Sequence, residues 1–260
     1  MATITLTTDF GARGHFAAVM KGVILGIAPK ALVIDITHEV EPFAIAEGAF
    51  TIGEAWRWFP KKTIHVVVVD PGVGSARRPV LVEAGGHFFV GPDNGVFSLI
   101  YEREKARVRH LTAAKYFLKN VGQTFHGRDV FAPVAAHLAA GARPASMGPA
   151  VTDYLRHGLA KPSRISTRTW NGVVLTVDRF GNLITNFHVA DFPDLRRRAI
   201  SILAGIHAVD CLVNNYAEAA EGEPVAIIGS SGFLEIILKQ DSAAKQLGCG
   251  VGTPVELNIL

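Results

Sequence analysis

The most constraining feature of this 260-residue sequence is a strand-like segment at residues 64–69, IHVVVV, which is aliphatic at nearly every position. A strand that is apolar on both faces is typically buried between two layers of helices in a parallel sheet. Strand-like segments at 4–8 and 32–37 precede it and alternate with segments of helical spacing at 15–27 and 45–59. This alternation predicts an α/β layer fold.

The residues that follow add antiparallel pairing to the predicted sheet. Residues 80–83 and 87–90 are predicted to form a hairpin around Gly85 and Gly86. Residues 130–139 are predicted to form a helix with Pro133 in its first turn, where proline is tolerated. The fold class expected for the first part is therefore α/β: a Rossmann-like domain with a mostly parallel or mixed sheet.

The pattern changes near residues 160–170. Residues 161–170 are polar and are predicted to be a linker. After them come short strand-like segments at 172–177, 200–203, 224–228, 234–238 and 255–259, with one short helix expected at 242–247. Short strands separated by turn residues are typical of a small β-barrel or sandwich. We predict an α/β domain over 1–160, a linker over 161–170 and a small β-barrel domain over 171–260.

Composition excludes several classes of protein. The chain is 49% hydrophobic and 19% charged, which rules out intrinsic disorder. The formal net charge is only +3, and the one dense basic run is Arg196–Arg198. A nucleic-acid-binding protein normally concentrates positive charge on one face, so we expect no nucleic-acid partner.

Cysteine usage and hydropathy bear on location. Two cysteines, Cys211 and Cys249, do not make a disulfide framework. Asp9 arrives before any apolar run long enough for a signal peptide, and no aliphatic stretch approaches the ~20 residues that span a bilayer. We therefore expect a cytoplasmic protein without membrane association.

Three aspartates lie in or at the ends of the predicted strands: Asp9, Asp35 and Asp70. Ligands of open α/β sheets bind beyond the carboxyl ends of the strands, where a carboxylate can take ribose hydroxyls or hold a nucleophile. The alternative is an Asx-turn, in which Asp binds its own downstream amides. Glycine follows closely after Asp9 and Asp70, and it permits close approach of a ligand to the backbone.

The glycine-rich segment after Asp70 is not a nucleotide-binding loop of a known kind. It lacks the lysine and hydroxyl ending of a P-loop, and Pro71 removes an amide donor. No GxGxxG follows the first strand either, so a standard NAD site is unsupported.

The segment TFHGRD places His126, Arg128 and Asp129 directly before an apolar helix. Asp129 can cap that helix, and Arg128 can pair with a surface carboxylate. A buried His126 satisfied by a backbone carbonyl is an alternative to a functional one. The spacing gives no HExxH or other paired-ligand signature, so no metal is expected.

Two polar segments stand out in the second half. The amide of Asn182, within DRFGNLITN, has donor and acceptor faces that suit an adenine edge, and the alternative is an ordinary turn. The GSSG segment at 229–232 can cradle a carboxylate through hydroxyls and amides, or simply connect two strands.

Taken together and in order, the motifs cover essentially the whole chain. They are TTDFG, DITHEVEPF, VVDPGVGSAR, GPDNG, TFHGRD, DRFGNLITN and GSSGFLEI. The sequence resembles the S-adenosylmethionine hydrolase family, whose relatives are the fluorinases and chlorinases that attack S-adenosylmethionine with halide. The resemblance implies an N-terminal α/β domain, a C-terminal β-barrel, and a homotrimer with active sites between the N-terminal domain of one subunit and the C-terminal domain of the next.

The resemblance also implies site residues. The catalytic triad falls on Asp70, Arg77 and His126, and the spacing favours Arg77 over Arg78. The implied substrate contacts are Asp9 for the ribose hydroxyls, Phe43 for the nucleoside wall, Phe180 and Asn182 for adenine, and Asp178 and Ser230 for the methionine end. Ser231 is left open, because the halogenases carry arginine there.

Departures from the halogenases indicate the reaction. Fluorinases have Tyr where this chain has Asp70, Thr at Val73 and a halide-binding Ser at Gly127; chlorinases share the glycine but keep the Tyr. A carboxylate at Asp70 repels halide and accepts a hydrogen bond from water. The expected activity is hydrolysis of S-adenosyl-L-methionine, by attack of water at C5′, to adenosine and L-methionine, with no cofactor. The alternatives are a non-catalytic S-adenosylmethionine or adenosine sensor and a halogenase.

Overall fold

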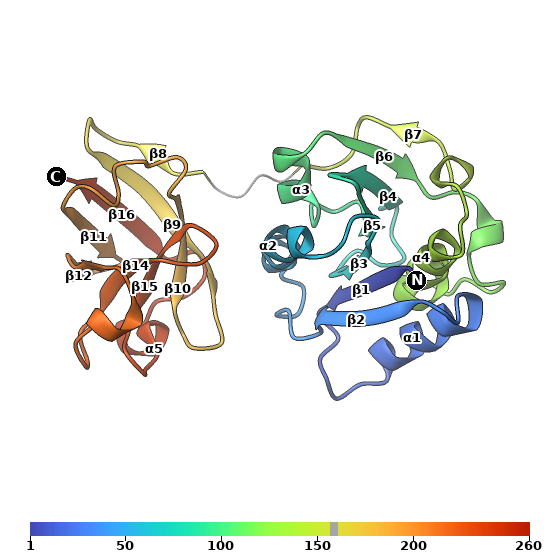
Figure 1. The fold of residues 1–260 in the computed structure, drawn as a ribbon, viewed down its shortest axis with the longest axis horizontal. Helices are drawn as coiled ribbons and strands as arrows, with labels where there is room; N and C mark the ends of the chain where they lie inside the picture. Colours follow the sequence, from blue (N-terminus) through green and yellow to red (C-terminus); the bar gives the residue numbers. More distant parts are fainter. Residues whose placement is uncertain (157–160) are drawn as a thin grey trace. The chain divides into compact units, whose positions relative to one another are not determined.

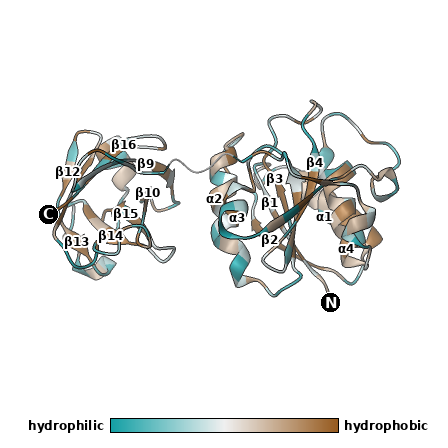
Figure 2. Ribbon diagram, turned by 90° about the horizontal axis from the view of Figure 1, so that it is seen from above, coloured by the Kyte–Doolittle hydropathy of each residue, from teal (hydrophilic) through white to brown (hydrophobic). Residues whose placement is uncertain are grey.

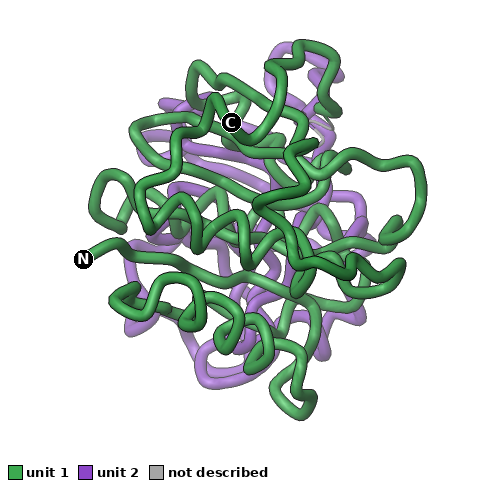
Figure 3. Tube along the Cα trace, turned by 90° about the vertical axis from the view of Figure 1, so that its right-hand side faces the viewer, with its two compact units in different colours: residues 1–158 green, residues 159–260 purple. Residues whose placement is uncertain are grey.

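The computed structural model describes residues 1–156 and 161–260. It divides into two compact units, residues 1–158 and 159–260, called unit 1 and unit 2 below (Figure 3). Residues 157–160 of the predicted N-terminal domain lie outside the described residues. Within the predicted linker, β8 (Ser163–Arg164) pairs antiparallel with β9 (Thr169–Val177). The Arg164 guanidinium donates to the carbonyls of Ser166 and Thr167, so these polar residues close a hairpin.

Unit 1 has the predicted α/β layer fold with a mixed sheet (Figure 1). Its strands lie in the order β2-β1-β3-β5-β4-β6-β7, and the first four are mutually parallel. The predicted hairpin is confirmed, because β4 and β5 pair antiparallel around Gly85 and Gly86, both at positive φ. The elements are β1 (Thr3–Thr8), α1 (Phe16–Ile27), β2 (Leu32–Thr37), α2 (Ile45–Ala55), β3 (Ile64–Val68), β4 (Pro79–Ala84), β5 (His87–Pro92), α3 (Ser98–Arg103), β6 (Ala106–His110), α4 (Ala132–Ala139) and β7 (Ala150–Val151).

Helices cover both faces of this sheet, as the aliphatic segment at 64–69 indicated. Helices α1 and α4 pack on one face, over Val66 and Val68 of β3. Helices α2 and α3 lie on the other, with Trp56 and Phe97 packed against Val67 (Figures 1 and 2). Every residue of β3 is buried. The sheet is therefore a rigid platform whose strand ends can hold functional loops.

Two predicted helices have different bounds in the structure. The helix expected at 45–59 ends at Ala55 and continues as a 3₁₀ turn, Trp56–Trp58. The helix expected at 130–139 begins earlier, with a π-helical turn at Gly127–Phe131 that leads into α4. Such turns are frequent at functional sites, and this one directly follows His126.

Unit 2 is the predicted all-β part, a curled half-barrel (Figure 1). Its strands lie in the order β12-β11-β16-β9-β10-β15-β14-β13, and β13 with β14 is the one parallel pair among the described residues of unit 2. Strand β10 was not expected from the sequence. Beyond β8 and β9, the elements are β10 (Leu183–His188), β11 (Ile200–Ala204), β12 (His207–Val209), β13 (Leu212–Val213), β14 (Val225–Ile228), β15 (Phe233–Ile237), α5 (Ala243–Leu247) and β16 (Pro254–Ile259). Within the described part of the chain, no helix is long and apolar enough to cross a membrane.

Candidate active site

Two of the three strand-end aspartates, Asp9 and Asp70, lie side by side. Strands β1 and β3 are parallel neighbours with Thr8 opposite Val68, so the loops that begin at Asp9 and Asp70 leave the same edge of the sheet. Asp35 lies within β2 and is engaged elsewhere, 2.5 Å from Lys21 Nζ and 3.1 Å from His38 Nε2.

Asp70, Arg77 and His126 form one hydrogen-bonded cluster. Arg77 Nε donates to both carboxylate oxygens of Asp70, at 3.0 and 2.9 Å, and its Nη2 also bonds Oδ2. The same Nη2 lies 2.7 Å from His126 Nδ1. The side chains of Asp70 and Arg77 are only 4% and 8% exposed. Charge-assisted, two-pronged contacts of this kind fix geometry as well as charge, so the Asp70 carboxylate is held in one orientation.

Gly74 lets the Asp70 loop approach the segment that carries His126. Its φ is +78°, and a Cβ at this position would lie 2.5 Å from the carbonyl oxygen of Gln123. Only glycine fits both the left-handed backbone and this contact. The glycine-rich loop therefore serves to bring residues 70–77 against residues 122–126, rather than to bind phosphate.

The hydrogen bond from Arg77 fixes the state of the His126 ring. A guanidinium has no acceptor, so Nδ1 of His126 accepts and the proton of the neutral ring is on Nε2. Burial and the adjacent Arg77 charge lower the pKa of His126. His126 is therefore neutral at physiological pH, with an Nε2–H donor. The Gly122 backbone also hydrogen-bonds the His126 ring and partly opposes this lowering of the pKa. The alternative of a histidine satisfied by a backbone carbonyl therefore holds in part, beside the contact with Arg77.

A pocket of about 220 Å³ opens beside this cluster. Asp9, Phe43, Asp70 and His126 all line it, and Val68, Val73 and Phe125 are among its apolar walls. Asp9 Oδ2 accepts from the Phe43 amide at 3.0 Å, which anchors Phe43 at a positive φ of 69° with its ring 71% exposed. Arg77 does not line the pocket. The structure thus brings four of the predicted residues together and places Arg77 behind Asp70.

The charged residues next to this cluster, Arg78, Arg128 and Asp129, have structural roles. Arg78 donates to Asp93 Oδ2 and to Asp153, away from Asp70. Asp129 does not cap the helix; its Oδ2 accepts from the Gly122 amide, and Arg128 pairs with it at 2.6 Å. The capping interpretation fails because the helix begins earlier, at the π-helical turn.

In unit 2, Asp178 organises the loop between β9 and β10. Its Oδ1 accepts from the amides of Phe180 and Asn182, both at 2.9 Å, and its Oδ2 accepts from Asn182 Nδ2 at 2.8 Å. This is an Asx-type turn, and an ordinary turn was the alternative that the sequence left open for this segment. Asn182 Oδ1 stays available as an acceptor within a side chain that is almost fully buried.

A second pocket, of about 640 Å³, adjoins this loop. Phe180, Asn182 and Tyr216 line it, and the Phe180 ring is 77% exposed. Asp178 and Ser230 are not among its lining residues. Sequence reasoning missed Tyr216, which follows two asparagines in a segment that shows no strand or helix pattern.

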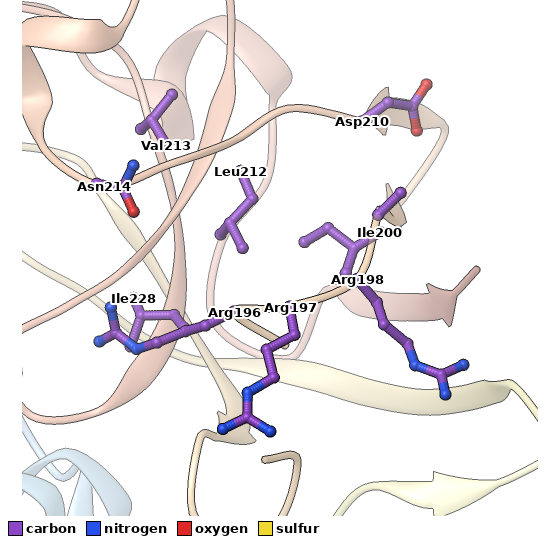
Figure 4. A pocket seen from close by; sticks show the side chains of 10 residues that line it. Arg196, Arg197, Arg198, Ile200, Asp210, Leu212, Val213, Asn214 and Ile228 are labelled. Atoms are coloured by element: carbon purple, nitrogen blue, oxygen red, sulfur yellow. The ribbon is translucent and has the colours of Figure 1, made fainter. Parts of the chain in front are cut away.

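A third pocket, of about 310 Å³, is lined by Arg196, Arg197 and Arg198 with Asp210 and Asn214. Figure 4 shows the three guanidinium groups pointing in different directions rather than at one point. None of the predicted site residues lines it.

Family models decide the affiliation of the chain. The N-terminal domain of SAM hydroxide adenosyltransferases matches residues 4–148, and their C-terminal domain matches residues 172–256. The chain belongs to the SAM hydroxide adenosyltransferase family. A curated member from Thermus thermophilus, "(R)-S-adenosyl-L-methionine hydrolase", is 37% identical and covers 99% of this chain and 100% of its own. A fluorinase from an Actinoplanes species is more distant, at 28% identity over 90% of this chain and 89% of its own.

A solved structure shows the same fold. An uncharacterised conserved protein from Thermotoga maritima superposes with a TM-score of 0.90 at 33% identity, covering 99% of both chains. At Gly127, where the resemblance implies a serine in fluorinases, a Cβ would lie 3.1 Å from Met20 Sδ and from the Phe125 ring. The pocket therefore leaves little room for the serine of the fluorinase pattern.

Proposed function

We propose that this chain hydrolyses S-adenosyl-L-methionine to adenosine and L-methionine by attack of water at C5′. The observation that carries the proposal is the buried Asp70–Arg77–His126 cluster. Its pocket also holds a strand-end carboxylate and an exposed aromatic ring. Curated relatives named as (R)-S-adenosyl-L-methionine hydrolases cover nearly the full chain, which supports the choice of substrate.

The proposed reaction depends mainly on a correctly oriented water molecule. As the C5′–O bond forms, the C5′–S bond breaks and its electron pair stays on the sulfur of methionine. Asp70 accepts a hydrogen bond from the attacking water, His126 is its second partner, and Arg77 holds Asp70 in place without touching the substrate. The proton leaves the new 5′-hydroxyl through the cluster to solvent. Alignment of this kind supplies up to roughly 7–11 kcal/mol in ideal cases.

Charge is destroyed in this reaction, because a hydroxide-like nucleophile meets a sulfonium cation. An apolar pocket that restricts water favours such a step. Val68, Val73 and Phe125 provide those walls in unit 1. We infer no metal in this scheme; among residues 1–156 and 161–260, no three His, Cys, Asp or Glu side chains are grouped to hold one.

The substrate contacts extend over both units. In this proposal Asp9 binds the ribose hydroxyls and Phe43 covers the nucleoside, while Phe180 and Asn182 take adenine and Asp178 with Ser230 takes the methionine end. The 220 Å³ pocket of unit 1 is smaller than the ~300–1,000 Å³ of typical ligand sites. We propose a homotrimer in which unit 1 of one subunit and unit 2 of its neighbour complete each site.

A cytoplasmic location belongs to the same proposal. Cys211 and Cys249 are both free thiols, the exposed Cys211 included. Unpaired cysteines are the usual state in a reducing compartment.

The test is a turnover assay with S-adenosyl-L-methionine, read by chromatography and mass spectrometry. Equal amounts of adenosine and methionine, independent of chloride or fluoride, are expected. Tight binding without product would instead identify a sensor, and a 5′-halogenated nucleoside in the presence of halide would identify a halogenase.

A further inference from the structure

A buried carboxylic acid occupies the middle of β15. Glu235 is 8% exposed within the otherwise apolar strand FLEII. Among the described residues, its carboxyl group has neither a hydrogen bond nor an ion pair, and its oxygens are not fully enclosed, so they keep some contact with solvent. Burying such a group without a partner is unfavourable, and neither the half-barrel core nor the proposed chemistry explains it.

Strand register places Glu235 between the two loops assigned to the methionine end. It lies opposite Ile184 of β10 and Ile227 of β14, so the three side chains share one face of the sheet. Two residues before Ile184 on that face is Asn182, which is bonded to Asp178. Two residues after Ile227 is Gly229, which begins the turn that carries Ser230.

The carboxyl group of Glu235 reaches toward that turn. A Cβ placed on Gly229 would lie 1.7 Å from Glu235 Oε1 and 2.4 Å from its Cδ. The glycine therefore makes the space that the carboxyl group fills. This gives the first glycine of the GSSG segment a specific role, which an ordinary connection between two strands does not need.

The charges around Glu235 are negative. Glu235 and the Asp178 carboxylate, in the loop after β9, repel each other, and both act electrostatically on Tyr216 of the 3₁₀ turn at Tyr216–Glu218. Burial and the Asp178 carboxylate raise the pKa of Glu235 to about 7. His188 lies at the turn that carries Ser230, with its Nε2 3.1 Å from the Ser231 carbonyl oxygen. Among the described residues, no Lys or Arg pairs with either carboxyl group, so the pair lacks a cation.

We propose that Glu235 and Asp178 together bind the α-ammonium group of the methionine part of the substrate. Glu235 releases its proton to solvent when the ammonium group arrives, and the resulting carboxylate pairs with it. Glu235 is thus a specificity residue for amino-acid-bearing nucleosides. The inference rests on the proposed function for its choice of ligand.

The wild-type protein gives a direct test with S-adenosyl-L-homocysteine, which has the ammonium group but no sulfonium to hydrolyse. We expect calorimetry to show binding about tenfold tighter at pH 8 than at pH 6, since one group with a pKa near 7 must ionise. At pH 6, titrations in buffers of different ionisation enthalpy should show close to one proton released per ligand. Adenosine and the deaminated analogue should show neither effect.

Two variants test whether Glu235 is the group that releases the proton when the ligand binds. Glu235→Gln should abolish the pH dependence, release no proton and leave adenosine affinity unchanged, whereas Glu256→Gln, on β16, should behave as wild type. A pH slope that survives in Glu235→Gln, or that appears equally with adenosine, overturns the proposal. Absence of any slope in the wild type overturns it too. The hydrolysis assay is read separately: a wild type that binds with this slope but forms no product refutes the proposed function alone.

Discussion

The two units treat buried charge in opposite ways. In unit 1, Asp70 is paired with Arg77, Asp93 with Arg78 and Asp129 with Arg128. In unit 2, Asp178 and Glu235 repel each other, and neither pairs with a cation among the described residues. A buried pair that is neutralised internally holds its geometry without a ligand, whereas two neighbouring carboxyl groups without a paired cation favour a cationic ligand. This contrast agrees with the proposed function, in which unit 1 carries the chemistry and unit 2 the recognition.

The two units also share a feature. Each presents an exposed phenylalanine beside its pocket, Phe43 in unit 1 and Phe180 in unit 2, at 71% and 77% exposure. Each ring follows a backbone amide that is bonded to an aspartate, Asp9 or Asp178. The same hydrogen bond, from a phenylalanine amide to an aspartate, thus positions an aromatic surface on each unit. Such a surface suits a ligand with a flat purine and a ribose.

The largest effect is expected from Asp70→Asn. The amide keeps the shape but loses the charge that orients water, so turnover should fall by about 10²–10⁴-fold, the usual range for a lost acid–base group. Calorimetry should find substrate affinity changed far less. Asp35→Asn is the matched control, because Asp35 pairs with Lys21 outside the pocket and its loss should leave turnover nearly unchanged. Near wild-type turnover in Asp70→Asn would remove the chemical role of unit 1.

A backbone change tests whether unit 1 depends on its loop geometry. Gly74→Ala adds a Cβ at positive φ and 2.5 Å from the Gln123 carbonyl oxygen, so it should destabilise the loop by about 1–3 kcal/mol and lower kcat. Gly141→Ala has the same sign of φ with no atom within 4 Å, so it isolates backbone strain from the contact. Thermal unfolding and kinetics on both variants give the comparison; equal kcat values would show that the contact at residue 74 does not position Asp70.

The pH dependence of stability should differ in sign between the units. Burial lowers the pKa of His65 to about 3, against 6.5 for a free histidine. The pKa values of His87, His110, His126 and His137 are lowered as well, largely by burial. The unfolded chain takes up these protons first, so unit 1 should lose stability as the pH falls below about 6.5. Glu235, raised from 4.5 to about 7, stabilises unit 2 most below pH 4.5 and loses that contribution as the pH rises through 7.

Tryptophan emission can follow unit 1 in the full chain. A Trp170→Phe variant leaves Trp56 and Trp58, both in unit 1, as reporters. Their unfolding midpoint should be lower at pH 5 than at pH 7. An unchanged midpoint would contradict the neutral, buried state of His65.

The smallest effect is expected from removal of metal. Exhaustive treatment with EDTA should leave turnover unchanged, since the proposed mechanism uses only side chains and water. Loss of activity on chelation that one added metal restores would show that His126 has been misinterpreted.

Much of the architecture of unit 1 could be predicted from sequence because its signals are local. The aliphatic sequence of β3 and the helical spacing of apolar residues in α1 indicate which residues are buried. Gly85 and Gly86 mark the position of the hairpin. Strand β10 was missed because its start, directly after Gly181 and Asn182, is dominated by turn chemistry. It pairs with the preceding strand β9 through that turn, and its other partner β15 lies about fifty residues later in the chain, where pairing leaves no local pattern.

The site residues also divide into those that could be predicted from local sequence signals and those that could not. The residues of the Asp70 loop were found from strand-end position and motif order, and the structure then showed that Arg77 lies behind Asp70 rather than in the pocket. Glu235 was not singled out, because a lone acidic residue in an apolar strand usually faces solvent. Only the structure shows that it is buried, on the sheet face it shares with Ile184 and Ile227, and that it interacts with Asp178. The one available signal was the alternation of side chains along FLEII. It places Glu235 on the sheet face away from Leu234 and Ile236, which pack in the core.

The division of labour between the units can be tested most directly by subunit complementation. Asp70→Ala removes the chemistry of unit 1, and Asn182→Ala removes recognition by unit 2; each variant alone should be inactive. Unfolding the two variants together in equal amounts and refolding them should restore about one quarter of wild-type activity, because in a closed trimer a site is intact when an unaltered unit 1 meets an unaltered unit 2 of the next subunit. A mixture that stays as inactive as its parents, while mass spectrometry shows mixed trimers, would contradict the account.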